Sequence, residues 1–302
     1  MSAHPSTSSP AARVAAQSAA QTAATSARVR PIARRQRGLA TSDGAGVSLT
    51  RVIGTSQLPA LDPFLMLDEF GSDTPGDYIA GFPSHPHRGF ETVTYMLDGR
   101  MRHKDNHGNE GLMTPGSVQW MTAGRGIVHS EMPEQEAGLM RGFQLWVNLP
   151  AKDKMCAPQY QEFGPERIPD VIVSEGVSAK VIAGRIGEVS GPVSQPATDP
   201  TYFDLAIAQG RVFAHALPAS HNVFAYVYEG AISVDGADVG RGELIVFGDG
   251  DSVRIEGRAP ASRLILVAGK PIGEPVARYG PFVMNTQDEI MQAVRDFQAG
   301  KF

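Results

Sequence analysis

Cysteine is nearly absent from this 302-residue chain, which contains a single one, Cys156. One thiol excludes an internal disulfide framework and any metal site built from several thiolates, and it favours a reducing compartment, for which we predict the cytoplasm. Because no histidine lies near it in sequence, Cys156 is expected to be unreactive. Long apolar runs are also missing, since no stretch reaches the eighteen or so uncharged residues of a membrane-spanning helix. We therefore expect no membrane segment.

Acidic residues are missing from residues 1–42, which contain six arginines and no lysine. The whole chain has a net charge of −5, so the remainder carries −11, with 21 basic and 32 acidic residues. An acidic body repels phosphate groups. We therefore expect no direct nucleic-acid binding by the folded part.

Large apolar side chains are scarce in the first part of the chain, which is rich in alanine, serine and threonine. Such a segment cannot bury enough surface to offset the entropy lost on ordering it, so we predict a disordered tail over residues 1–36. An acid-free segment that contains arginine and serine also fits an organelle transit peptide, and this alternative stays open.

Glycine and proline are abundant, at 33 and 22 residues, and they divide the rest of the chain into short segments. Both residues favour turns, and the strand–helix alternation of a doubly wound sheet is not present. We therefore predict an all-β fold. The expected strands lie at residues 91–97, 117–122, 126–131, 142–149, 202–208, 222–228, 243–247 and 263–267.

A faint internal repeat divides this region in two. Tyr95-Met96-Leu97-Asp98-Gly99 is echoed 131 residues later by Tyr226-Val227-Tyr228-Glu229-Gly230. This spacing suits one small barrel, so we predict two tandem antiparallel β-barrels of the jelly-roll type. The first is expected over residues 37–165 and to bind metal, and the second over residues 166–302 and to carry none.

One short helix is expected at the C-terminal end. Thr286-Gln287-Asp288-Glu289 has the pattern of a capping box, with threonine at the N-cap and glutamate three residues later. Ile290, Val294 and Phe297 then recur at helical spacing on one face. We expect this helix to cover a barrel end.

Two short segments carry the chemistry: His85-Pro86-His87-Arg88-Gly89-Phe90-Glu91 and Gly124-Arg125-Gly126-Ile127-Val128-His129-Ser130-Glu131. In a strand, residues i and i+2 project to the same face. His85 and His87 therefore point the same way, as do His129 and Glu131. If the two strands are neighbours that face one barrel interior, three imidazoles and one carboxylate converge on one point.

This donor set suits one divalent first-row ion, because imidazole and carboxylate ligands bind Fe(II), Mn(II), Ni(II), Cu(II), Co(II) and Zn(II). Three neutral imidazoles and one carboxylate leave such an ion with a formal charge of +1. That charge favours an anionic oxygen donor such as an enolate or phenolate. Open coordination positions indicate catalysis or sensing rather than a structural site.

The same segments resemble the pirin family of the cupin superfamily, and the resemblance runs from roughly residue 34 to the C-terminus. Further similar stretches are Pro63–Asp68, Gln144–Leu149, Pro158–Gln161 and Gly280–Thr286. The resemblance implies two β-barrel cupin domains, of which the N-terminal one binds iron, most simply as Fe(II). The family's ligands fall on His85, His87, His129 and Glu131.

Other polar residues near the motifs have two interpretations each. In the general cupin pattern Glu91 would be a ligand, but Glu131 can replace it, so Glu91 is expected to support the ligands or to be structural. His103 either lines the cavity mouth or lies in a solvated loop, and we favour the loop. Gln119 and Met121 share one strand face, where Met121 is expected to pack in the core or, less simply, to form part of a substrate wall.

Arg125, between two glycines and near His129, either pairs with an anionic ligand or is solvated. In the second half, His215 and His221 lack a histidine or glutamate two residues away. This absence is the basis for expecting no metal in the second domain.

The resemblance implies two functions from different classes. The first is a quercetin 2,3-dioxygenase activity, in which the metal binds a flavonol, Glu131 accepts its 3-hydroxyl proton as general base, and O₂ opens the ring. The second is an interaction module whose iron redox state alters affinity for a protein partner such as an enzyme or transcription factor. The partners expected from the sequence are thus a small flavonol-like molecule and O₂, with a protein partner as the alternative.

Overall fold

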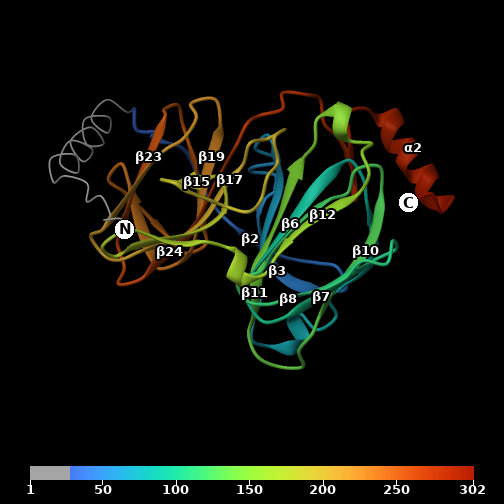
Figure 1. Cartoon of the computed structure of the whole chain (residues 1–302), viewed down its shortest axis with the longest axis horizontal. Helices are drawn as coiled ribbons and strands as arrows, with labels where there is room; N and C mark the ends of the chain where they lie inside the picture. The colour runs from blue at the N-terminus through green and yellow to red at the C-terminus, as the bar shows by residue number, and fades with distance from the viewer. Residues whose placement is uncertain (1–27) are drawn as a thin grey trace, which may run out of the picture.

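The computed structural model describes residues 28–302, which form twenty-six strands, three short 3-10 helices and one α-helix. Figure 1 shows two β-rich lobes side by side, with the helix at the outer end of one of them. In the first lobe a seven-stranded sheet, in the order β12-β9-β6-β11-β4-β3-β2, accompanies a four-stranded sheet in the order β5-β10-β7-β8. The strands of this lobe are β2 (Leu39–Asp43), β3 (Val47–Ile53), β4 (Phe64–Ser72), β5 (Phe82–His87), β6 (Phe90–Asp98), β7 (Met101–Asp105), β8 (Glu110–Met113), β9 (Val118–Thr122), β10 (Ile127–Pro133), β11 (Met140–Asn148) and β12 (Gln159–Phe163).

The second lobe repeats this plan with a seven-stranded sheet in the order β1-β22-β19-β24-β17-β14-β13 and a four-stranded sheet in the order β18-β23-β20-β21. Its strands are β1 (Ile32–Arg37), β13 (Asp170–Ser174), β14 (Val177–Ala183), β17 (Thr201–Ile207), β18 (Val212–Ala216), β19 (Asn222–Glu229), β20 (Ala231–Val234), β21 (Ala237–Gly240), β22 (Glu243–Phe247), β23 (Ser252–Gly257) and β24 (Ser262–Gly269). Two small pairs complete the strands: β15 (Arg185–Ile186) with β16 (Val189–Ser190), and β25 (Ala277–Tyr279) with β26 (Phe282–Met284).

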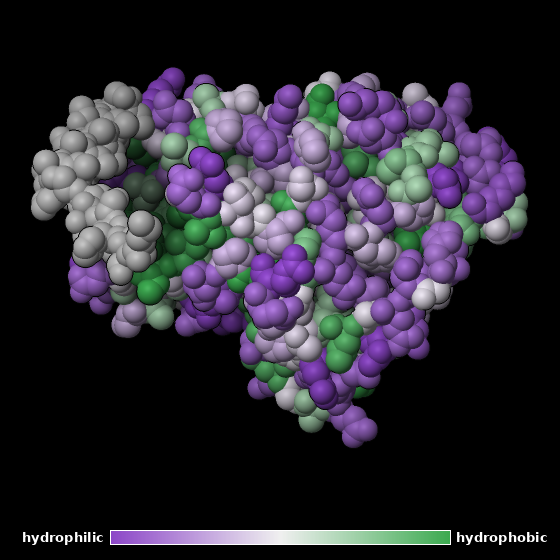
Figure 2. Space-filling view, viewed as in Figure 1, coloured by the Kyte–Doolittle hydropathy of each residue, from purple (hydrophilic) through white to green (hydrophobic). Residues whose placement is uncertain are grey.

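The all-β prediction with two tandem domains is confirmed, and all eight strands expected from the sequence are present. The predicted barrels differ in one respect, because each lobe consists of two separate sheets and does not close through continuous hydrogen bonding. The 3-10 helices η1 (Pro75–Asp77), η2 (Ala151–Asp153) and η3 (Pro165–Arg167) lie in the connections. No helix of the described residues is long and apolar enough to span a membrane. Figure 2 shows hydrophilic residues over most of the visible face.

Each end of the described chain packs on the lobe formed by the other half of the sequence. Strand β1 pairs with β22 of the second lobe, so residues 32–36, which the sequence places in the tail, are ordered. Residues 1–27 of that predicted tail lie outside the described residues. At the other end, α2 (Gln287–Gln298) starts with the predicted capping box at Thr286 and packs against the first lobe, where Arg88 Nη1 lies 2.9 Å from Asp296 Oδ2.

The lobes share a continuous core between their large sheets, and the sequence repeat lies within it. Tyr95 on β6 and Tyr226 on β19 are both fully buried there. Their hydroxyl groups donate to buried carboxylates: Tyr95 to Asp204 at 2.7 Å and Tyr226 to Glu69 at 2.6 Å. Each buried acid is thus satisfied by a tyrosine of the other lobe, which gives the interface specific pairing as well as apolar contact.

The buried side chain of Lys154 links three segments of the first lobe and the C-terminal hairpin. Its ammonium group is buried and donates to the carbonyl oxygens of Gly89 at 2.7 Å and Val283 at 3.1 Å, and to Asn148 Oδ1 at 2.6 Å. Burial lowers the pKa of Lys154 to about 8, so the group remains largely protonated at pH 7. Its three donors thus join the start of β6, strand β26 and the end of β11.

We expect the substitution Lys154→Met to lower the free energy of unfolding by about 2–4 kcal/mol, because three buried acceptors lose their charged donor. Chemical denaturation at pH 7 with a chelator present measures this loss without a contribution from bound metal. Lys152→Met is the matched control, since Lys152 is exposed on the adjacent turn of 3-10 helix η2 and should change stability by less than about 0.5 kcal/mol. Equal stability of the two variants would contradict this role.

Candidate metal centre

Strands β5 and β10 bring the two histidine motifs together. They pair antiparallel, with His129 opposite His85 and Ile127 opposite His87. Because side chains alternate along a strand, all three histidines project into the interior of the first lobe. The register shifts between His129 and Glu131, which lies opposite Phe82. This irregularity moves Glu131 along β5 relative to the histidines.

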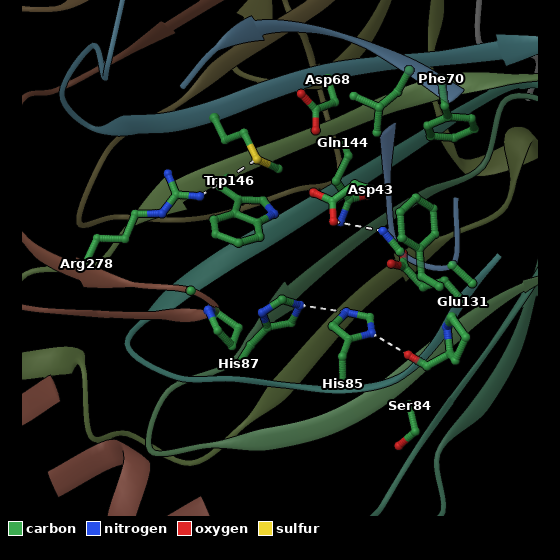
Figure 3. Close-up of a pocket in the computed structure, with 18 residues that line it drawn as sticks. Asp43, Asp68, Phe70, Ser84, His85, His87, Glu131, Gln144, Trp146 and Arg278 are labelled. Carbon is green, nitrogen blue, oxygen red and sulfur yellow. Dashed lines mark hydrogen bonds between the residues drawn. The ribbon is translucent and has the colours of Figure 1, made fainter. Parts of the chain in front are cut away.

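The three imidazoles form a compact group, as the sequence predicts. One ring nitrogen from each of His85, His87 and His129 lies within 4.8 Å of the others. The Nε2 atoms of His85 and His87 are 3.0 Å apart (Figure 3). Since His85 Nδ1 donates to the carbonyl oxygen of Pro83 at 2.8 Å, its Nε2 atom presents a lone pair to the group.

Burial keeps two of these histidines, His87 and His129, uncharged. His87 and His129 are 3% and 2% exposed. Burial, together with the neighbouring histidines, lowers the pKa of His87 well below its usual value and that of His129 to about 3. Neutral imidazole is the form that binds a metal ion.

The donor atoms fit a divalent cation. Neither ring nitrogen of His129 has a hydrogen-bond partner among the described residues, although both are buried. A buried polar atom without a partner is costly. A cation bound between the three rings would give one nitrogen of His129 a partner, and would be shared with one nitrogen each of His85 and His87. The three-histidine group could therefore hold a metal ion.

Glu131 lies beside this group and lines the same cavity. The compact set of atoms within 4.8 Å consists of the three histidines, so the carboxylate stands next to it rather than inside it. The carboxyl group is buried, and burial raises its pKa. Thr94 Oγ1 donates to Glu131 Oε1 at 3.1 Å and holds the carboxyl group from the large sheet.

The cavity has a volume of about 550 Å³, and His85, His87 and Glu131 form part of its lining. Its wall is largely apolar and includes Phe70, Phe82 and Trp146. The Trp146 ring centroid lies 5.4 Å from that of His87. A pocket of this size and lining suits a small aromatic molecule.

Sequence reasoning missed part of this wall, namely Asp68, Gln144, Trp146 and Arg278. A signal existed for two of them, because Gln144 and Trp146 are two residues apart in a recognisable strand and share its inner face. No such signal marks Arg278, whose position depends on contacts between residues distant in sequence.

The structure does not bring Glu91 to the histidines. On β6, Phe90 packs against His87 and Thr94 donates to Glu131, so alternation turns Glu91 to the opposite side of the sheet. There Glu91 Oε1 accepts from Thr122 Oγ1 at 2.6 Å and from Gln195 Nε2 at 2.5 Å. This corresponds to the structural alternative left open for Glu91, because Gln195 belongs to the second half of the chain.

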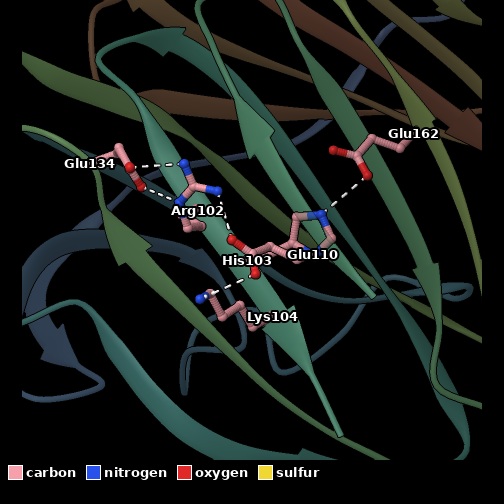
Figure 4. A network of polar contacts seen from close by, with 6 residues as sticks. All are labelled: Arg102, His103, Lys104, Glu110, Glu134 and Glu162. Atoms are coloured by element: carbon pink, nitrogen blue, oxygen red, sulfur yellow. Dashed lines mark hydrogen bonds and ion pairs between the residues drawn. The ribbon is translucent and has the colours of Figure 1, made fainter. Parts of the chain in front are cut away.

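The favoured interpretation of His103 as a solvated loop residue is wrong. His103 lies on β7 directly opposite Glu131, is 1% exposed, and places Nε2 3.1 Å from Glu162 Oε2. Figure 4 shows this contact crossing from β7 to β12. The neighbouring Arg102 and Lys104 instead contact Glu110 of β8, and Arg102 also contacts Glu134, which follows β10. Since β7 and β12 belong to different sheets, the contact of His103 with Glu162 links the two sheets through side chains.

The remaining candidates lie outside the cavity lining. Gln119 and Met121 are buried on the inner face of β9, where Met121 packs with Ala123 and Ile127. Arg125 is exposed on the turn before β10, and its backbone N–H donates to the Cys156 carbonyl oxygen at 2.8 Å.

In the second lobe, strands β18 and β23 occupy the places of β5 and β10. Phe213 pairs there with Ile255, and His215 pairs with Val253. Phe213, Val253 and Ile255 are buried in an apolar core that fills the space between the sheets. The same scaffold therefore holds a polar cavity in one lobe and a packed core in the other.

Comparisons with known proteins agree with this architecture. Residues 46–147 match the pirin family and residues 202–302 match the pirin C-terminal cupin domain. A pirin-like protein of Caulobacter vibrioides is 54% identical over 275 residues, which cover 91% of this chain and 99% of that protein. Human pirin is 44% identical over 267 residues, which cover 86% of this chain and 89% of that protein.

Among solved structures, a quercetin 2,3-dioxygenase from Acinetobacter baumannii superposes with a TM-score of 0.85 and 32% sequence identity. The superposition covers 91% of this chain and 98% of that chain. Both lobes are thus matched in sequence and in structure, and the chain belongs to the pirin family, with two cupin domains.

Proposed function

We propose that this protein is a metal-dependent dioxygenase that opens the ring of a flavonol such as quercetin with O₂. The observation that carries the proposal is a group of three histidines beside a buried glutamate, next to a cavity of about 550 Å³ with aromatic walls. The similarity to a quercetin 2,3-dioxygenase supports the same reaction class. The single cysteine favours the cytoplasm as its compartment.

The metal ligands in this proposal are His85, His87 and His129, with Glu131 as the fourth. Fe(II) is the preferred ion, and Mn, Ni, Cu, Co and Zn share the same ligand preferences. When bound, the ion supplies Lewis acidity and open positions for substrate oxygen and O₂. The protein supplies uncharged imidazoles, which need not lose a proton before binding it.

Glu131 is the general base in this mechanism. Burial raises the pKa of its carboxyl group, so the carboxylate is a stronger base than a solvated glutamate and can accept the flavonol 3-hydroxyl proton. Thr94 holds Glu131 Oε1 in position, and the apolar wall around Phe70 and Trp146 excludes water from the deprotonated substrate.

The substitution His87→Ala removes a direct ligand and should weaken metal binding by more than about tenfold. Loss of a residue that only hydrogen-bonds to a ligand already costs about 10–100-fold in metal affinity. Elemental analysis after dialysis against a metal buffer measures this effect. His215→Ala is the matched control because His215 lies on β18, the second-lobe counterpart of β5. Unchanged metal content in the His87 variant would exclude this site.

Replacing the base by Glu131→Gln should reduce flavonol turnover by about 10²–10⁴-fold while the fold is retained. Loss of flavonol absorbance together with O₂ uptake measures turnover of metal-loaded protein. Glu134→Gln is the control, because Glu134 lies just beyond the same strand and pairs with Arg102 at the surface. Full turnover by the Glu131 variant would show that another group accepts the proton.

The alternative function, a redox-dependent interaction module, makes a different prediction for the same protein. A change of metal charge in a low-dielectric cavity would alter affinity for a protein partner. Metal-loaded wild-type protein that consumes neither flavonol nor O₂, but binds a partner only in one oxidation state, would favour this alternative.

A further inference from the structure

Arg278 is an exposed residue that lines the same cavity as His85 and His87. Its guanidinium carbon lies 4.7 Å from the centroid of the Trp146 ring, whose other neighbour is His87 at 5.4 Å. These two distances limit the separation between the guanidinium group and the His87 ring to about 10 Å. Figure 3 shows Arg278, Trp146 and His87 along one side of the cavity.

The guanidinium group of Arg278 has no carboxylate partner among residues 28–302, and its one polar contact is with Met66 Sδ at 4.0 Å. The two nearby acids are already engaged. Arg51 donates to both oxygens of Asp68, at 2.9 and 2.7 Å, and to Asp43 at 2.9 Å. Arg278 therefore keeps its hydrogen-bond donors free for a molecule that enters the cavity.

The backbone that carries Arg278 is fixed to the metal centre. Arg278 pairs with Val283 across the β25–β26 hairpin, whose turn contains Gly280 at a φ of +54°. The N–H of Val283 donates to the carbonyl oxygen of Arg88 at 3.0 Å. Arg88 directly follows His87, so the hairpin and the histidine strand are held in one position relative to each other.

Trp146 holds the Arg278 side chain over the cavity, because an indole face attracts a guanidinium group. Although Arg278 is exposed as a residue, the cavity wall removes part of the water around its guanidinium group, and this desolvation, together with the nearby Arg51 cation, lowers its pKa. A cation that is held in place and partly desolvated binds an anion more strongly than a mobile surface arginine does.

We propose that Arg278 is the specificity-determining residue of the cavity and that it binds a carboxylate at the end of the substrate remote from the metal. The substrate class is then a hydroxylated aromatic carboxylic acid, whose oxygens face the histidines while its acid group meets the guanidinium. This inference deepens the proposed dioxygenase function and rests on it. The planar fork of arginine matches the two oxygens of a carboxylate, which lysine cannot reproduce.

The test compares two probes that differ at one position, 3-hydroxyflavone and 4′-carboxy-3-hydroxyflavone. Their dissociation constants for metal-loaded wild-type protein are measured by quenching of tryptophan fluorescence, and their kcat and KM by loss of absorbance. Wild-type protein should bind the carboxylated probe at least about tenfold more tightly, a difference of about 1.4 kcal/mol. Arg278→Gln should abolish this preference and leave the dissociation constant of the neutral probe within about twofold.

Arg254→Gln is the control variant, because Arg254 is an exposed arginine on β23 of the second lobe. It should retain the full preference, and Arg278→Lys should retain only part of it. The inference is overturned if wild-type protein shows no preference, or if Arg278→Gln weakens both probes equally, as a purely structural wall residue would. Absence of ring opening with the binding preference intact would instead refute the dioxygenase reaction and leave the carboxylate site standing.

Discussion

The antiparallel register of β5 and β10 is the constraint on which the metal centre depends. It sets His85 opposite His129 and turns His87 to the same side, in a space where burial holds the imidazoles of His87 and His129 neutral. A slip of one residue would send these side chains to the outer face of the sheet. Arg88, which follows β5, supports this register. Its guanidinium group donates to the carbonyl oxygen of Arg125, just before β10, and pairs with Asp296 of α2.

The two lobes show how one scaffold serves two purposes. Their strand orders correspond position by position, yet among the described residues only the first lobe brings three histidines together on the inner face of its small sheet, whereas His215 of the second lobe packs against Phe203 and Phe213. At the corresponding places the second lobe has Phe213, Val253 and Ile255, which fill the interior. The chemical difference therefore comes from a few side chains at equivalent strand positions, while the large sheets and their shared core stay alike.

The sequence predicted much of this arrangement, because its strongest signals are local. Alternation identified the strands, the i, i+2 spacing identified the histidine pair, and Thr286 and Glu289 identified the helix start. Its failures concern contacts between distant segments. His103 was misassigned because a polar hairpin sequence does not reveal that Glu162 comes from another sheet. Arg278 was missed because its neighbours Trp146 and Met66 are more than 130 residues away in the chain.

The crossing of the two chain ends limits how this molecule can be divided. Strand β1 supplies an edge strand to the second lobe, whereas the last hairpin and α2 cover the first. A cut in the connection between the lobes would thus leave each fragment without a piece that the other carries. Although the fold repeats itself, its halves are interdependent, and neither half of the polypeptide contains all the parts of a self-sufficient unit.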